Sequence, residues 1–222
     1  MLANYKAVVF DMDGILFDSE RLVIDCWKVV AEKYAIPDIE EACNECLGVN
    51  GVETKEKFLD RYGRDFPYDA YKAEMSKIYH DNYDGGRLPM KIGVAELLEY
   101  LKETGVKVAL ASSTRTQVVV QQLRDAGILE YFQVIVGGDM VKRSKPQPDI
   151  FLKACEELGV APEESFAIED SYNGIRAAAA GHLRPLMVPD LMPPTDEMRN
   201  LSEAILDTLL EVKGYLRNIQ NA

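Results

Sequence analysis

From residue 94 to the C-terminus, short apolar runs alternate with stretches of helical periodicity, and this alternation constrains the fold more than any other feature. Strands separated by helices in this rhythm predict a parallel sheet with helices on both faces. The predicted strands are residues 6–10, 106–111, 133–136, 165–168 and 185–188, and the predicted helices are residues 94–101, 118–126, 150–158, 175–180 and 201–216. We therefore expect an α/β fold built on a doubly wound parallel sheet.

The stretch between the first strand and residue 84 has a different character. Residues 19–83 show helical periodicity, and residues 84–89 (DGGRLP) break the pattern before the strand–helix alternation begins. The first strand is therefore separated from the others by an inserted helical unit. We place the α/β core at residues 1–17 plus 86–222 and the small helical domain at residues 18–85.

Charge limits the partners that such a chain can have. Its 222 residues carry 25 Lys and Arg against 37 Asp and Glu, which gives a net charge of −12. This charge repels phosphate backbones, so we expect neither nucleic acid nor an anionic membrane as a partner, although a small phosphorylated ligand is compatible. No apolar run approaches the ~18–20 residues of a membrane span, and acidic residues follow Phe10 too early for a signal peptide. We expect a cytoplasmic monomer.

Polar residues follow four of the predicted strands at their carboxyl ends, where open parallel sheets bind ligands. They are Asp11 and Asp13 after the first strand, Ser112, Ser113 and Thr114 after the second, Asp139 and then Lys145 after the third, and Glu169 and Asp170 after the fourth. Alternation along an extended chain places Asp11 and Asp13 on the same side. Carboxylates, hydroxyls and one lysine are therefore expected at one edge of the sheet.

Four carboxylates at one edge repel one another, so either a divalent cation joins them or some of them stay protonated. Carboxylate oxygens with a few waters are the ligands that Mg²⁺ prefers. The hydroxyl of Ser112 and the ammonium of Lys145 suit a phosphate group. Together these groups indicate phosphoryl transfer through an aspartyl-phosphate.

Four segments of the chain resemble the motifs of a known family. They are residues 11–16 (DMDGIL) with 18–20 (DSE), residues 111–113 (ASS), residues 144–149 (SKPQPD) and residues 168–174 (IEDSYNG). In this order they resemble the four motifs of phosphatases of the haloacid dehalogenase (HAD) superfamily, and the helical insertion resembles the cap of the β-phosphoglucomutase-like branch. The resemblance spans essentially the whole chain. It implies a Rossmann-like core, a cap that sets substrate specificity, and a Mg²⁺-dependent phosphoric monoester hydrolase.

The resemblance also implies catalytic and phosphate-binding roles. Asp11 would be the nucleophile that attacks phosphorus, and Asp13 would protonate the leaving oxygen and then activate water. Lys145, Ser112 and Ser113 would hold the phosphoryl oxygens, and Lys145 would also offset the charge of Asp11. For Ser112, a role as the cap of the following helix stays open and is compatible with phosphate binding.

The same resemblance implies the metal site. Mg²⁺ would be held by the carboxylates of Asp11 and Asp170 and by the backbone carbonyl of Asp13. Glu169 is expected either as a further ligand or as the group that orients the nearby lysine. Asn173 would brace these ligands from behind.

Two departures from β-phosphoglucomutase bear on the reaction. Where that enzyme has a His after the first motif and an Arg in the cap, this chain has Val23 and Gly51. A mutase must hold a bisphosphate at both ends, so the missing cation favours a phosphatase of a small phosphorylated metabolite, a sugar phosphate, with β-phosphoglucomutase as the alternative. The predicted specificity residues of the cap are Asn50, Gly51 and Lys55, with Lys72 and Lys77 as further candidates.

A signalling receiver was the alternative from a different class. Receivers also combine acidic residues with a hydroxyl and a lysine, but they have no cap after the first strand, and their phosphorylated Asp follows a later strand. The long helical insertion disfavours this reading.

Overall fold

The computed structural model describes residues 5–47, 49 and 51–221. Its centre is a six-stranded sheet in the order β3-β2-β1-β4-β5-β6, in which every pairing is parallel. The strands are β1 (Ala7–Phe10), β2 (Lys107–Ser112), β3 (Val134–Gly137), β4 (Ser165–Glu169), β5 (Arg184–Met187) and β6 (Ala204–Ile205). The five predicted strands agree to within one residue, and the predicted α/β fold with a doubly wound parallel sheet is confirmed.

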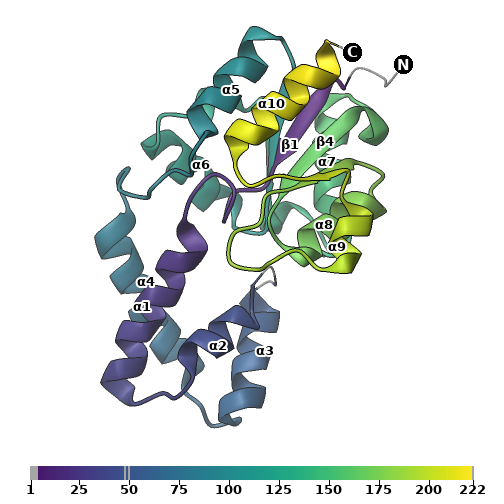
Figure 1. Ribbon diagram of the computed structural model, residues 1–222. Helices are drawn as coiled ribbons and strands as arrows, with labels where there is room; N and C mark the ends of the chain where they lie inside the picture. Colours follow the sequence, from purple (N-terminus) through teal and green to yellow (C-terminus); the bar gives the residue numbers. More distant parts are fainter. Residues whose placement is uncertain (1–4, 48, 50, 222) are drawn as a thin grey trace.

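Helices cover both faces of the sheet (Figure 1). They are α5 (Val94–Glu103), α6 (Thr116–Asp125), α7 (Asp149–Leu158), α8 (Tyr172–Ala180), α9 (Asp196–Leu201) and α10 (Leu209–Gln220), with 3₁₀ turns at Leu129–Tyr131, Gly138–Met140 and Pro162–Glu164. Val8 and Phe10 of β1 pack with apolar side chains of α5, α6 and α10, whereas Ala7 and Val9 pack with those of α7 and α8. Alternate residues of one strand thus build two separate apolar layers.

Strand register decides which polar residues can meet. Phe10, the last residue of β1, lies opposite Leu110 of β2 and Ile168 of β4. The segments that follow these three strands therefore leave the sheet at the same edge. This edge lies where the strand order turns from β2-β1 to β4, the position at which doubly wound sheets bind ligands.

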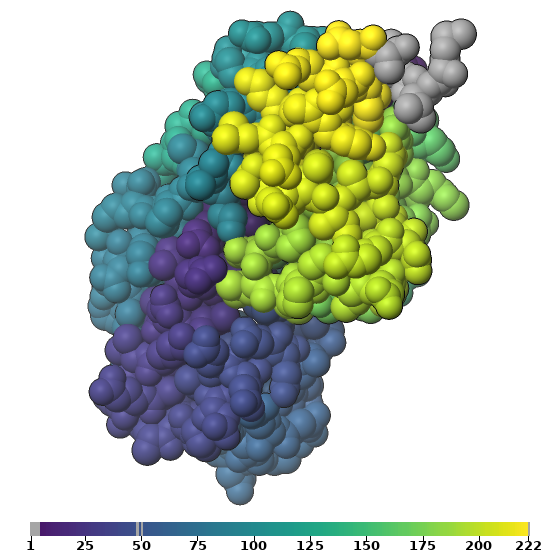
Figure 2. All heavy atoms as spheres, viewed as in Figure 1, coloured from purple at the N-terminus to yellow at the C-terminus, as the bar shows by residue number. Residues whose placement is uncertain are grey.

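The described residues of the inserted segment form four helices, which lie together as a lobe beneath the sheet (Figures 1 and 2). They are α1 (Ser19–Tyr34), α2 (Ile39–Asn44), α3 (Gly51–Tyr62) and α4 (Tyr68–Tyr83). The Trp27 ring stacks on Tyr68 at 6.0 Å and lies 5.0 Å from the ring of Phe58, and all three side chains are buried. Trp27 thus belongs to the apolar core of this lobe. The division at residues 17/18 and 85/86 stays a prediction.

Two chain segments connect the lobe to the sheet, and backbone hydrogen bonds join them. The amide of Asp18 donates to the carbonyl of Pro89 at 3.1 Å, and the amide of Lys91 donates to the carbonyl of Leu16 at 2.9 Å. The outgoing and returning chains therefore run side by side at the base of α1.

One predicted element is wrong. The expected helix at residues 201–216 is replaced by the end of α9, the short strand β6 and the start of α10. Thr208 begins α10 as its N-cap, since its hydroxyl accepts from the amide of Glu211 at 3.3 Å. The Glu211 carboxylate accepts in return from the amide of Asp207 at 2.9 Å, and Ala204 pairs with Leu186 of β5. Capping and strand pairing therefore interrupt the helical periodicity.

Candidate active site

A cleft of about 590 Å³ lies between the carboxyl edge of the sheet and the helices α1–α4. The sheet contributes residues from the ends of β1, β2 and β4, and the loop after β3 contributes Lys145. The predicted residues that line this cleft are Asp11, Asp13, Ser113, Lys145, Glu169, Asp170 and Gly51. Segments distant in sequence therefore meet at the predicted edge.

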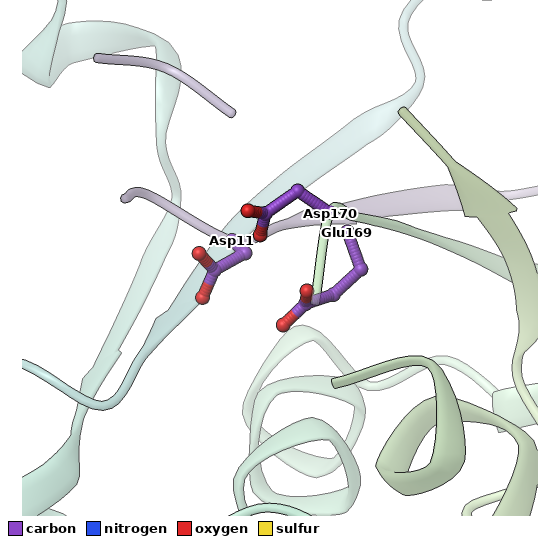
Figure 3. A group of neighbouring side chains, drawn as sticks. All are labelled: Asp11, Glu169 and Asp170. Atoms are coloured by element: carbon purple, nitrogen blue, oxygen red, sulfur yellow. The ribbon is translucent and has the colours of Figure 1, made fainter. Parts of the chain in front are cut away.

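Three carboxylates form the centre of the cleft. Asp11, Glu169 and Asp170 each bring an oxygen within 4.8 Å of the others, and all three residues are buried. Figure 3 shows the three side chains grouped together, with their carboxylates extending toward the same side. Their closeness follows from the pairing of β1 with β4, because Asp11 comes directly after one strand and Asp170 directly after its neighbour.

Lys145 neutralises part of this negative charge. Its ammonium donates to Asp11 Oδ1 at 2.5 Å, to Glu169 Oε1 at 2.6 Å and to the carbonyl of Ala111 at 3.2 Å. The side chain is only 3% exposed, so all three of its donors are used inside the protein. Burial alone would lower the pKa of Lys145, but Asp11 and Glu169 raise it above its usual value. The lysine is therefore a permanent cation of the site.

Both carboxylate oxygens of Glu169 have partners. Oε1 accepts from Lys145, and Oε2 accepts from the backbone amide of Ser171 at 2.8 Å and from its hydroxyl at 3.0 Å. A Cβ on Gly174 would come within 1.7 Å of Glu169 Oε1, so only glycine at this position of α8 leaves room for the carboxylate. These contacts fix Glu169 in the position from which it binds the Lys145 ammonium.

Asp13 has a separate set of partners. Its Oδ1 accepts from the hydroxyl of Ser19 at 2.6 Å, and its Oδ2 accepts from the hydroxyl of Thr114 at 3.0 Å. Ser19 is the first residue of α1, whereas Thr114 lies in the loop after β2. The Asp13 side chain thus connects the helical lobe to the core.

Electrostatics favour a cation at this centre. Burial raises the pKa of Asp11 to about 8 although Lys145 opposes the shift, and burial with the charge of Glu20 raises the pKa of Asp170 well above its usual value. A Cβ on Gly14 would meet Asp170 Oδ2 at 2.4 Å, so only glycine at this position lets the backbone pass this close to the carboxylate. Carboxylate oxygens whose charge is not fully neutralised are the kind of ligand that Mg²⁺ prefers.

The three hydroxyl residues after β2 lie in different environments. Ser112 is fully buried, and its hydroxyl accepts from the amide of Thr114 at 3.1 Å. Ser113 and Thr114 line the cleft.

Asn173, the predicted brace, accepts a hydrogen bond from Arg176 at 3.2 Å.

The predicted cap residues do not all reach the cleft. Gly51 lines it, and a Cβ there would lie 3.6 Å from the ammonium of Lys72, which also lines it. Lys55 instead pairs with Asp69 at 2.6 Å, and Lys77 pairs with Asp81; neither lysine lines the cleft. Asn50 lies outside the described residues.

Sequence reasoning assigned no role to Ser19, Glu20 and Asp190, which the structure brings to the site. Ser19 and Glu20 stand within the quoted first motif, and the motif alone does not show what they contact. Asp190 follows β5 by three residues. The rule applied to the other four strand ends would have found it there.

The site and the fold can now be compared with known proteins. A family model described as haloacid dehalogenase-like hydrolase matches residues 8–188. The chain belongs to the haloacid dehalogenase-like hydrolases. The family predicted from the four motifs is confirmed, and so is the prediction that the chain is an enzyme, a hydrolase of this family.

Three relatives place this hydrolase more narrowly. The phosphorylated carbohydrates phosphatase of Thermotoga maritima is 34% identical over 78% of this chain and 80% of its own length. The β-phosphoglucomutase of Bacillus subtilis is 32% identical over 93% of this chain and 94% of its own length. The structure of CbbY from Rhodobacter sphaeroides in complex with phosphate superposes with a TM-score of 0.77 at 29% identity, and it covers 94% of this chain and 96% of its own. The resemblance to the β-phosphoglucomutase-like branch is thereby confirmed.

Proposed function

We propose that this hydrolase is a Mg²⁺-dependent phosphatase of a small phosphorylated metabolite, a sugar phosphate, that works through a phosphorylated Asp11. The observation that carries the proposal is the position of the Asp11 carboxylate at the centre of the cleft, within 4.8 Å of Asp170 and bound to Lys145. That the substrate is a phosphoric monoester is supported by the phosphatase names of relatives.

The metal would be held by the carboxylates of Asp11 and Asp170 and by the backbone carbonyl of Asp13. The raised carboxyl pKa values of Asp11 and Asp170, and the grouping of their oxygens within 4.8 Å, support this assignment. When bound, Mg²⁺ would neutralise charge on the transferring phosphoryl group. Glu169 has partners on both oxygens, which favours its role in orienting Lys145 over direct ligation.

The side chains of this protein carry out the rest of the reaction. The Asp11 carboxylate forms a bond to phosphorus while the bond from phosphorus to the leaving oxygen breaks, and Asp13 gives that oxygen a proton. Asp13 then takes a proton from a water whose oxygen attacks the phosphorus, which releases phosphate and restores Asp11. Ser113, which lines the cleft, and Lys145 would hold the phosphoryl oxygens, with the ammonium giving up its bond to the Ala111 carbonyl. Ser112, the third predicted phosphate-binding residue, is fully buried and is not among the residues that line the cleft.

The size and lining of the cleft support a small substrate. The helical side contributes Val23, Gly51 and Lys72, and the core side contributes Arg115. One relative is named as a phosphatase of phosphorylated carbohydrates and another as a phosphoglycolate phosphatase. The cap helices would set which leaving group fits, and the paired chains at Leu16 and Pro89 would be the hinge.

The second candidate function is that of β-phosphoglucomutase, favoured by the Bacillus subtilis relative of that name. Val23 and Gly51 both line the cleft and carry no charge, so these two positions supply no cation for a second phosphate. On this ground we favour hydrolysis over isomerisation, although Lys72 and Arg115 also line the cleft and carry positive charge.

The experiment that decides between the two is a phosphate-release assay with Mg²⁺ over a panel of sugar phosphates. Wild-type protein is compared with Asp11→Asn, and the panel includes β-glucose 1-phosphate primed with the 1,6-bisphosphate and read separately for glucose 6-phosphate. Release that requires both Mg²⁺ and Asp11 supports the phosphatase. Isomerisation that outpaces release would support the mutase, and release that persists in Asp11→Asn would contradict both.

Part of the expected setting stays a prediction. Among the described residues, no helix has the length and apolar character needed to cross a membrane. The cytoplasmic location, the monomeric state and the absence of a nucleic-acid or membrane partner remain to be measured.

A further inference from the structure

A second group of carboxylates adjoins the first. Glu20, Asp170 and Asp190 each bring an oxygen within 4.8 Å of the others. They come from three elements: Glu20 from the first turn of α1, Asp170 from the end of β4 and Asp190 from the loop after β5. Asp170 belongs to both groups, so it lies within 4.8 Å of Asp11 and Glu169 and also of Glu20 and Asp190.

Asp190 has an oxygen with no partner. Its side chain is only 4% exposed, and Lys91 donates to Oδ1 at 2.6 Å. Its Oδ2 is buried and has no hydrogen-bond partner. A buried carboxylate oxygen without a donor carries a desolvation penalty that nothing in the described chain offsets. Such an atom, among carboxylates from other elements, is what an oxygen-bound cation would satisfy.

The charges of the combined site point the same way. Five carboxylates line the cleft, namely Asp11, Asp13, Glu20, Glu169 and Asp170, and Asp190 adjoins two of them as the sixth. In the described part of the chain, the lysines that form ion pairs with them are Lys145 and Lys91. Six carboxylates against two lysines leave four negative charges when all are ionised. One divalent cation beside Asp11 would halve this excess, and a second would remove it.

We propose that Glu20, Asp170 and Asp190 hold a second divalent cation, with the Asp170 carboxylate shared between the two metal sites. All three ligands are carboxylates, which suits Mg²⁺, Mn²⁺ or Ca²⁺ rather than a softer metal. Lys91 fixes Asp190 through Oδ1 and leaves Oδ2 to the cation. The first magnesium site is part of the proposed function, and this second site adds to it without depending on which metabolite is hydrolysed.

The test counts bound ions on metal-free protein. Mn²⁺ is titrated into the wild type, and the free aqueous ion is measured by electron paramagnetic resonance. Two ions per chain are expected for the wild type, and one for Asp190→Asn and for Glu20→Gln, with the affinity for the second ion reduced at least tenfold in each. The double variant should bind no fewer ions than either single variant, because both substitutions remove the same site. Asp65→Asn, an exposed carboxylate outside the cleft, is the matched control and should bind two.

Each of the following outcomes would overturn the proposal. A wild-type chain that binds a single Mn²⁺ has no second site, and two ions that survive both substitutions would place the second ion elsewhere. If the wild type binds one Mn²⁺ and Asp190→Asn lowers the affinity for that ion, these carboxylates affect the first metal site and do not form a second one. A wild type that binds none would also contradict the first metal site. Thermal melting of every variant shows whether it is folded.

Discussion

The substitution Gly14→Ala separates the effect of backbone strain from the effect of displacing the Asp170 carboxylate. Gly14 has φ +78°, and a Cβ built there would lie 2.4 Å from Asp170 Oδ2, whereas ordinary contacts begin at 3.4 Å. The Asp170 carboxylate must therefore withdraw by about 1 Å, and a misplacement of that size in a catalytic group costs about 100-fold in rate. The left-handed backbone adds about 1–2 kcal/mol of lost stability.

The chain offers a matched control for the backbone. Gly127 has φ +71°, and a Cβ there would meet nothing within 4 Å. Gly14→Ala and Gly127→Ala should both melt lower by about 2–8 °C. Only Gly14→Ala should also lose activity and require more Mg²⁺, because only that substitution moves a carboxylate of the site.

The assay measures phosphate release against Mg²⁺ concentration, with the melting temperature of each variant recorded in parallel. The reasoning is refuted if Gly14→Ala keeps its activity within a fewfold of Gly127→Ala. Equal loss of activity in both variants would likewise show that strain alone, and not Asp170, is responsible.

Three further outcomes follow from the site. Lys145→Met leaves the buried carboxylates of Asp11 and Glu169 without their cation, so it should cost about 3–5 kcal/mol of unfolding free energy in urea titrations and reduce phosphate release to background. The pKa of Asp11 is about 8 in the folded chain and 3.8 in the unfolded chain, so the folded state binds the proton more tightly. Metal-free protein should therefore lose stability as pH rises from about 4 to 8. The loss should reach up to about 1.4 kcal/mol per unit of pKa difference. Melting curves in a chelator test this, and Asp11→Asn should flatten the profile. Lys72→Met should raise KM about tenfold at unchanged kcat for substrates with a second anionic group, whereas Lys55→Met, outside the cleft, should leave both constants unchanged.

Much of the fold follows from local pattern. The strands at residues 106–111 and 133–136 are short apolar runs. Such runs can be recognised from the sequence without knowledge of the helices that pack on them. The expected helix at residues 201–216 failed because its apolar spacing continues across a break that capping creates. The sequence TLLE at residues 208–211 matches a capping box and was the available signal.

The candidate site was predictable where its residues directly follow strands. Asp11 and Asp170 were found in this way because parallel register brings strand ends to one edge. Lys145 was found from its place in the loop that follows β3. Lys55 was not separable from Lys72 by sequence, since both are cap lysines. Their difference is an ion pair with Asp69 that only the packing of α3 against α4 creates.

The sequence by itself determined the class of fold, the family and the residues able to do phosphoryl chemistry, because these depend on local periodicity and on motifs contiguous in the chain. Only the tertiary structure decided how those residues are used. Tertiary contacts bind Glu169 to Lys145 and Ser171. They hydrogen-bond Asp13 to Ser19 and Thr114. They also bring Asp190 close to Asp170, with Asp190 Oδ2 lacking a hydrogen-bond partner. Burial and through-space charge govern these contacts, and neither is a property of residues that are neighbours in sequence.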